Sequence, residues 1–203
     1  MIRQEHGTLP MCHSFLGTAS FWSLLFRIDE DLAAQARAAG CASCGGVLHS
    51  ARYPRKPRGL AGWLLGDEYA RRLSFCCERE GCRRRTTPPS VRFLGRRVFL
   101  GTVVVLTTAL AAGLTRRRVA ALHERFGVSV RTLRRWRAWW QEGFVASTLW
   151  RELRARLASP IAVARLPAAL LERLAGEDLA ARLIQLLRLI APLSTSSYPR
   201  EGG

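Results

Sequence analysis

Residues 41–46 read CASCGG, and residues 77–82 read CEREGC. Two cysteine thiolates that lie close in sequence can hold one metal ion only where the backbone turns tightly between them. Glycines such as Gly45 and Gly81 permit these turns and leave backbone amides free to bond the sulfurs. Four thiolates make a closed tetrahedral site, so the pattern predicts structural zinc within a small ribbon of antiparallel strands. The predicted ligands are Cys41, Cys44, Cys77 and Cys82.

The second half of this predicted site contains two adjacent cysteines, Cys76 and Cys77. In a strand, alternate side chains point to opposite faces. Cys77 is in phase with the apolar Leu73 and Phe75, whereas Cys76 is in phase with Ser74. We therefore expect Cys77 to be the ligand, with Cys76 as the alternative. Other donors that could replace one ligand are His49, Cys12 and His13.

Residues 115–140 predict two helices joined by a turn at Gly127, with Ser129 as the cap of the second helix. At 100° per residue, the apolar side chains of the second helix fall within an arc of about 120°. They are Val130, Leu133, Trp136 and Trp140. Two helices joined by a glycine turn, with arginines on the outer face of the second, predict a helix-turn-helix. A generic helical hairpin with a solvated basic face is the alternative.

The basic side chains of these two helices are the candidate nucleic-acid contacts. Arg131 and Arg135 lie near the pole opposite the apolar arc, where a guanidinium fork could reach guanine edges in a major groove. The start of the first helix would lie nearer the phosphates, which fixes docking without reading sequence. The predicted contacts are Arg131, Thr132, Arg134 and Arg135 on the second helix and Arg116, Arg117 and Arg118 on the first.

The charge of the chain favours a polyanionic partner. Its 203 residues include 32 basic and 15 acidic side chains, for a formal net charge of +17. Residues 51–140 alone contribute 21 basic and 5 acidic side chains, or +16. A general preference for arginine would spread the charge more evenly, so we interpret the excess as a localised binding surface for double-stranded DNA. An anionic membrane and a solvated basic face are the alternatives.

Four segments follow from these patterns. They are an N-terminal helical segment (1–40), the zinc ribbon (41–90), the helix-turn-helix (91–143) and a C-terminal helical segment (144–203). Gly40 suits the position after a helix end. In the last segment, Ser159 and Pro160 predict a helix start, and residues 178–190 predict a further helix. The expected fold class is mainly α, with a small β zinc ribbon, a helix-turn-helix and C-terminal helices.

Residues 98–114 carry no charge and are flanked by arginines. This uncharged run is shorter than the roughly 20 residues that a helix needs to span a bilayer core, and it includes glycines and threonines. We expect a buried helix rather than a membrane segment, with a strand over 103–105 as the alternative. Segment 144–203 or a second subunit would cover it. The N-terminal residues lack the pattern of a signal peptide, so we expect a cytoplasmic protein with reduced cysteines.

Two basic arms, residues 52–59 and 83–90, contain prolines that favour extended backbone. Such arms can follow phosphates or enter a minor groove, and solvated linkers are the alternative.

Four stretches, in this order, resemble the zinc-ribbon and helix-turn-helix part of bacterial transposase-related proteins: CASCGG, RYPRKPRG, FCCEREGCRRRTTPPSVRFLGRRV and GVSVRTLRRWRAWW. The resemblance covers about residues 41–142. In such proteins these parts hold the DNA of a mobile element, and a separate domain with three acidic residues cuts it. The resemblance implies that the four cysteines bind zinc and that the helix over residues 130–140 reads DNA.

The chain departs from a full transposase after Glu142, where about 60 residues remain. The acidic residues left are Glu152, Glu172, Glu177, Asp178 and Glu201. This length cannot hold a nuclease sheet domain, so we expect no enzymatic activity. The expected protein is an accessory or truncated product of a mobile element, or a regulator derived from one. The alternatives are a zinc-stapled adaptor that binds a partner protein or a second copy of itself through residues 144–203, and the DNA-binding subunit of a separately encoded nuclease.

Overall fold

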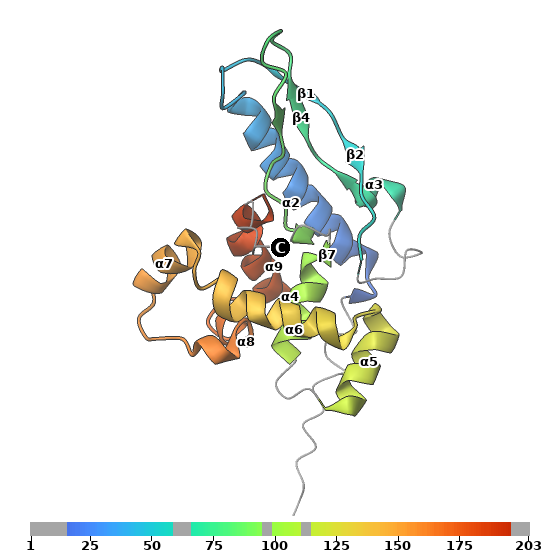
Figure 1. Ribbon diagram of the computed structural model, residues 1–203, viewed down its shortest axis with the longest axis vertical. Coiled ribbons are helices and arrows are strands. Elements are labelled where there is room, and N and C mark those ends of the chain that lie inside the picture. Colours follow the sequence, from blue (N-terminus) through green and yellow to red (C-terminus); the bar gives the residue numbers. More distant parts are fainter. Residues whose placement is uncertain (1–15, 59–65, 95–98, 111–114, 196–203) are drawn as a thin grey trace, which may run out of the picture.

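The computed structural model describes residues 16–58, 66–94, 99–110 and 115–195, which are mostly helical with three small antiparallel sheets (Figure 1). The cysteine-bearing strands lie at one end of the molecule, and helices α4 to α9 gather toward the other. Within the described ranges, no helix combines the length and the apolar character needed to cross a membrane. The expectation of a mainly α protein with a small β part is confirmed.

Helix α2 (Ala19–Ala38) runs from the helical end of the molecule to the cysteine-bearing end (Figure 1). The residues that it buries recur at helical spacing and are Phe21, Trp22, Leu25, Ile28, Asp29 and Ala33. Gly40, at φ +73°, follows the helix end, and its amide donates to the Arg37 carbonyl at 3.1 Å. A left-handed residue at this position ends an α-helix, so Gly40 turns the chain toward Cys41 as the sequence predicts.

The sheet beside the cysteines has three antiparallel strands in the order β1-β4-β5. They are β1 (Leu48–Ser50), β4 (Phe75–Cys77) and β5 (Arg85–Thr86). Leu48 lies opposite Cys77, and strand alternation buries Phe75 together with Cys77. With Leu73 and Ala33 of α2, these side chains belong to a small hydrophobic core that is separate from the main one.

Backbone pairing holds parts of both basic arms to the body of the protein. In the first arm, β2 (Tyr53–Pro54) pairs with β3 (Arg71–Arg72), which follows the short helix α3 (Asp67–Ala70). Further along the same arm, Arg58 forms a parallel bridge with Phe99. In the second arm, residues 85–86 are strand β5. The arms are therefore extended as predicted, but these parts of them are sheet rather than free linker.

Helix α4 (Gly101–Leu110) is buried around its circumference over residues 101–108. Strands β6 (Phe93–Leu94) and β7 (Phe99–Leu100) pair with each other and lead directly into it. Helices α6, α8 and α9 pack against α4, so the C-terminal segment covers it as one of the two expected partners. The buried helix predicted over 98–114 is thus present over 101–110, whereas residues 99–100 are a strand. Residues 98 and 111–114 lie outside the described ranges.

Helix α5 (Arg116–Phe126) has the boundaries that the sequence predicts, whereas α6 (Val130–Ala138) begins as predicted and ends two residues before Trp140. Gly127, at φ +62°, makes the turn between them, and Ser129 caps α6 by accepting a hydrogen bond from the Thr132 amide at 3.3 Å. The helix then widens into a π-helical turn, η3 (Trp139–Gly143). The side chains that α5, the turn, α6 and η3 bury are Leu122, Val128, Leu133, Trp136 and Trp140.

The C-terminal segment differs in part from the prediction. Its elements are α7 (Thr148–Ala155), η4 (Val163–Arg165), α8 (Ala168–Leu171), α9 (Leu179–Ile190) and η5 (Ala191–Ser194). The predicted helix over 178–190 is present and is capped by Asp178, which accepts from the Ala181 amide at 2.7 Å. The predicted helix start at Ser159 is wrong, because its hydroxyl accepts from the Arg173 guanidinium at 2.6 Å instead of capping a helix. Pro167 disfavours helix at the residue before it, so only short turns form here.

The main core contains an ion pair that sequence reasoning missed. Asp29 and Arg92 are each 1% exposed, and Arg92 Nε lies 2.8 Å from Asp29 Oδ2. The same carboxylate accepts from the Ser90 hydroxyl at 2.6 Å and from the Val91 amide at 2.7 Å. Arg92 also donates to the carbonyl oxygen of Tyr69, and three aromatic rings surround its guanidinium. This network joins α2 to the segment that precedes β6.

Candidate metal centre and basic surface

The first cysteine turn begins where α2 ends. The Cys41 amide donates to the Gly46 carbonyl at 2.9 Å, which closes the loop between them. Inside this loop, the amides of Cys44 and Gly45 both donate to the Cys41 carbonyl, at 3.2 and 2.7 Å. Gly45 has a φ of +68°, a conformation that residues with a side chain rarely adopt. The turn that the glycine pattern predicts is therefore present, and it brings two sulfurs to one side.

The second cysteine turn follows strand β4. The amides of Cys82 and Arg83 donate to the Arg79 carbonyl at 3.1 and 3.3 Å. Gly81 has a φ of +82°, and Arg83 has a φ of +43°. Pairing of β1 with β4 sets this turn beside the first one, because Leu48 lies opposite Cys77. The Arg79 guanidinium reaches across and donates to the Cys44 carbonyl at 3.1 Å, so it also ties the two turns together.

The two turns bring four sulfur atoms together, all within 4.8 Å of one another. They belong to the cysteines that the sequence analysis selected, Cys41, Cys44, Cys77 and Cys82. Sulfurs from opposite turns make the close pairs: Cys41 lies 3.7 Å from Cys82, and Cys44 lies 3.5 Å from Cys77. Cys41 and Cys77 are buried, and the other two are half-buried. This arrangement can hold one metal ion.

The alternative ligands lie elsewhere. Cys76 directs its sulfur away from the cluster, toward the carbonyl oxygens of Cys77 and Arg83 at 3.7 and 3.4 Å. His49 is exposed and pairs with Glu78 at 2.7 Å. Cys12 and His13 lie outside the described residues. Strand alternation therefore chooses between the adjacent cysteines, since Leu73, Phe75 and Cys77 share the buried face.

The thiols of the cluster differ in acidity. The Ser43 amide lowers the pKa of Cys41, burial opposes it, and the Cys44 amide and neighbouring sulfurs add to the lowering, so the pKa is about 7. At Cys77 the Arg79 amide also lowers the pKa, but burial and the three neighbouring cysteine sulfurs outweigh it and raise the pKa to about 12. Of these two thiols, Cys41 therefore loses its proton more readily than Cys77 in the metal-free cluster. A bound cation would favour the thiolate at every position.

Gly46 lies against the cluster and leaves no room for a side chain. A Cβ built on Gly46 would lie 3.0 Å from the Cys77 sulfur and 3.4 Å from the Cys44 sulfur. The first distance is tighter than ordinary van der Waals contact and the second is at its limit, so a larger residue would require the Cys77 sulfur to shift by a few tenths of an ångström. The second glycine of CASCGG is therefore required by the close approach of its backbone to the sulfurs.

The predicted DNA contacts form the outer surface of α5 and α6. Arg116 and Arg117 are exposed in the first turn of α5, whereas the side chain of Arg118 lies outside the described part of the structure. On α6, the exposed side chains are Arg131, Arg134 and Arg135, and Thr132 is half-buried against the cap residue Ser129.

Arg135 is exposed but does not simply point into solvent. Its guanidinium carbon lies 5.8 Å from the centre of the Phe99 ring, which in turn packs edge-on against Trp136. Sequence reasoning did not single out Phe99, and it included Arg58 only as part of the basic arm 52–59. Both residues line a cavity with Arg131 and Arg135. No local sequence signal links them, because β7 and the first basic arm reach α6 only through the tertiary fold.

Comparison of the chain with protein families, curated proteins and solved structures found no match to any of them. Function is therefore inferred from the chemistry of the cysteine cluster and of the basic surface.

Proposed function

We propose that this chain is a zinc-containing protein that binds double-stranded DNA. In this proposal the cysteine cluster is a structural zinc site, and α5 and α6 are a helix-turn-helix. The observation that carries the DNA-binding part is the two-sided character of α6. Its inner side is buried through Leu133 and Trp136, while its outer side exposes Arg131 and Arg134.

The donor set fits zinc. Zinc–thiolate bonds are about 2.3 Å long, so four sulfurs around a tetrahedral ion lie about 3.8 Å apart. The two close sulfur pairs are 3.7 and 3.5 Å apart, and no pair in the cluster exceeds 4.8 Å. Sulfur ligands favour zinc over magnesium and calcium, which take oxygen ligands. Since four protein ligands leave no open position, the ion would stabilise the fold rather than perform chemistry.

The geometry of α6 suits a major groove. A helix nine residues long, held by a cap at Ser129 and by its buried inner face, presents a rigid row of arginines. Guanidinium groups recognise guanine edges and phosphates through paired hydrogen bonds. Arg116 and Arg117, at the start of α5, add cationic groups that suit backbone phosphates.

The biological role that we propose is an accessory or regulatory one, connected with a mobile element through the resemblance to transposase-related proteins. Two acidic residues beyond Glu142 have structural partners of their own. Glu172 pairs with Arg165 at 2.6 Å, and Asp178 caps α9. Each of these two carboxylates therefore has a structural role in the fold.

The test is selection of binding sites from random duplexes, repeated with single variants at two salt concentrations. Arg131→Ala should flatten the preference between sites, because each good bidentate base contact is worth about 1–3 kcal/mol of discrimination. Arg117→Ala should weaken all sites alike and reduce the salt slope by about one. Arg154→Ala, an exposed arginine on α7, is the control. The DNA-binding proposal fails if the wild type retains no duplex, and the role of α6 in reading sequence fails if Arg131→Ala and Arg154→Ala behave alike.

A further inference from the structure

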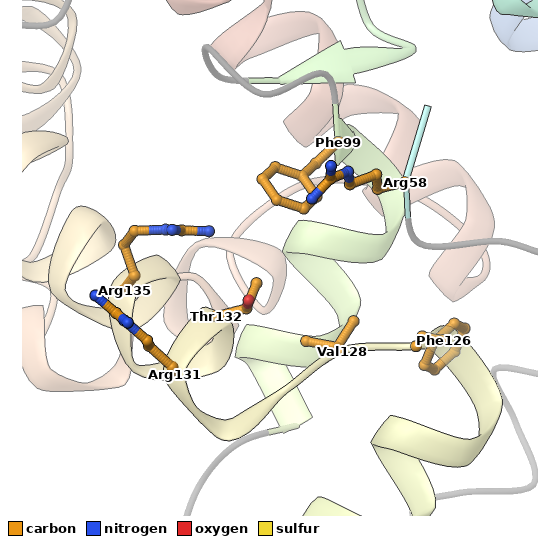
Figure 2. Close-up of a pocket in the computed structure, with 8 residues that line it drawn as sticks. Arg58, Phe99, Phe126, Val128, Arg131, Thr132 and Arg135 are labelled. Carbon is orange, nitrogen blue, oxygen red and sulfur yellow. The ribbon is translucent and has the colours of Figure 1, made fainter. Parts of the chain in front are cut away.

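A cavity of about 320 Å³ lies between the first basic arm, strand β7 and the start of α6. Its lining includes three arginines and two aromatic rings, and no acidic side chain among the described residues. The lining residues are Arg58, Phe99, Phe126, Gly127, Val128, Arg131, Thr132 and Arg135. Figure 2 shows the side chains of Arg58 and Arg135 reaching toward this space from opposite sides.

Backbone contacts fix the position of Arg58 in the cavity wall. The Leu100 amide donates to the Arg58 carbonyl at 3.2 Å, and Arg58 forms a parallel bridge with Phe99. On the opposite wall, Arg135 is fixed by α6, and its guanidinium lies 5.8 Å from the centre of the Phe99 ring. The two arginines therefore reach the cavity from separate elements, and guanidinium groups on its lining would attract an anion.

We propose that this cavity binds a phosphate group of a nucleic acid, with Arg58 and Arg135 on either side of it. The inference deepens the proposed DNA-binding function and rests on it for the source of the phosphate. Arg135 would then contact the phosphate backbone of the nucleic acid. Recognition of the base sequence would depend on the arginines on the outer face of α6.

Three features of the cavity favour a phosphate over other occupants. Guanidinium groups form strong charge-assisted hydrogen bonds to phosphate oxygens, which suits an anion with several acceptors. Arg131 and Thr132 place the cavity at the N-terminus of α6, where the helix dipole favours negative charge. The Phe99 and Phe126 rings add apolar surface that suits a sugar or a base attached to the phosphate.

The experiment compares Arg58→Ala, Arg135→Ala and the double variant with two matched controls. The controls are Arg154→Ala on α7 and Arg188→Ala on α9, two exposed arginines that do not line the cavity. Affinity for a fluorescent duplex is measured by anisotropy over a range of salt concentrations. Thermal unfolding of each variant checks that it folds.

Each cavity variant should weaken duplex binding by about tenfold, as expected for loss of one hydrogen-bonded contact to a charged group. If both arginines hold the same phosphate, the double variant should lower the salt slope by about one and lose less affinity than the product of the two single losses. A decrease of about two in the salt slope of the double variant would mean that the two arginines contact two separate phosphates, and it would overturn the shared site. Lysine at either position should restore part of the affinity, because it keeps the charge.

A second experiment tests whether the phosphate site exists independently of DNA binding. Wild type and variants are titrated with adenosine 5′-monophosphate, followed by NMR of the arginine Nε–H groups. If the chain binds no duplex but binds the mononucleotide through Arg58 and Arg135, the DNA-binding function fails and the phosphate site stands. If neither ligand depends on Arg58 and Arg135 more than on Arg154 and Arg188, the phosphate site is wrong, whatever the outcome for DNA.

Discussion

Replacement of Asp29 by alanine should be among the most destabilising single changes in the chain. The carboxylate is 1% exposed and accepts hydrogen bonds from the Ser90 hydroxyl, the Val91 amide and Arg92 Nε. Asp29→Ala removes all three acceptor contacts and leaves the Arg92 charge buried without its counter-ion. Loss of one partner from a buried ion pair costs about 3–5 kcal/mol of unfolding free energy. Since a typical domain is stable by about 5–15 kcal/mol, this is a large share of the total.

The assay is urea unfolding, followed by circular dichroism and tryptophan fluorescence and extrapolated linearly to water. Asp31→Ala is the matched control, because Asp31 lies two residues further along α2 and is exposed. Its unfolding free energy should change by no more than about 0.5 kcal/mol. A loss below about 1 kcal/mol in Asp29→Ala, with an unchanged slope, would refute the account of an uncompensated charge.

A double variant separates charge from packing. Asp29→Leu combined with Arg92→Met replaces both ions by apolar side chains of similar size, which in other buried pairs is close to neutral. The double variant should therefore unfold at a higher urea concentration than Asp29→Ala. If the two unfold together, loss of the Ser90 and Val91 hydrogen bonds to the Asp29 carboxylate, which both variants share, rather than the unpaired Arg92 charge, accounts for the loss.

Three further outcomes are expected. Cys77→Ser should lose its metal while Cys76→Ser keeps it, as measured by elemental analysis of freshly purified, reduced protein, because only the Cys77 sulfur lies in the cluster. Gly46→Ala should weaken metal retention against a competing chelator, since its Cβ would lie 3.0 Å from the Cys77 sulfur, whereas Gly66→Ala, with nothing within 4 Å, should not. Leu133→Ala, at a position that is 0% exposed, should cost about 2–5 kcal/mol in urea unfolding and reduce DNA binding at every sequence alike.

Local sequence patterns predicted the elements whose signals are also local. Gly40, Gly127 and Ser129 mark helix ends because their φ angles and side-chain hydrogen bonds depend on neighbours in sequence. The alternation of side chains along a strand likewise predicted Cys77 rather than Cys76 as the ligand, because a few residues suffice to show which side chains share a face. These short-range rules account for the cysteine cluster and for the α5–α6 unit.

Long-range contacts explain most of what sequence reasoning missed. Asp29 falls on the buried side of α2, four residues after Leu25, but its partner Arg92 lies 63 residues away. A charged residue at a buried helical position is the signal that could have indicated a partner. The strands in the basic arms were harder to predict from the sequence, because strands of two residues such as β2 are too short to show an alternating pattern. The error at Ser159 came from giving a capping pattern more weight than Pro167, which follows it within about two turns of helix.

Helix α2 belongs to two hydrophobic cores at once, with Leu25 in the main core and Ala33 in the small core beneath the cysteines. Because α2 runs to Ala38, three residues before Cys41, the larger core anchors the helix that leads into the metal site. Removing the metal should then release the loops and short strands between the two cysteine turns while α2 stays folded. Amide hydrogen exchange of the metal-free protein should then differ along α2, with slow exchange around Leu25 and faster exchange toward Ala38.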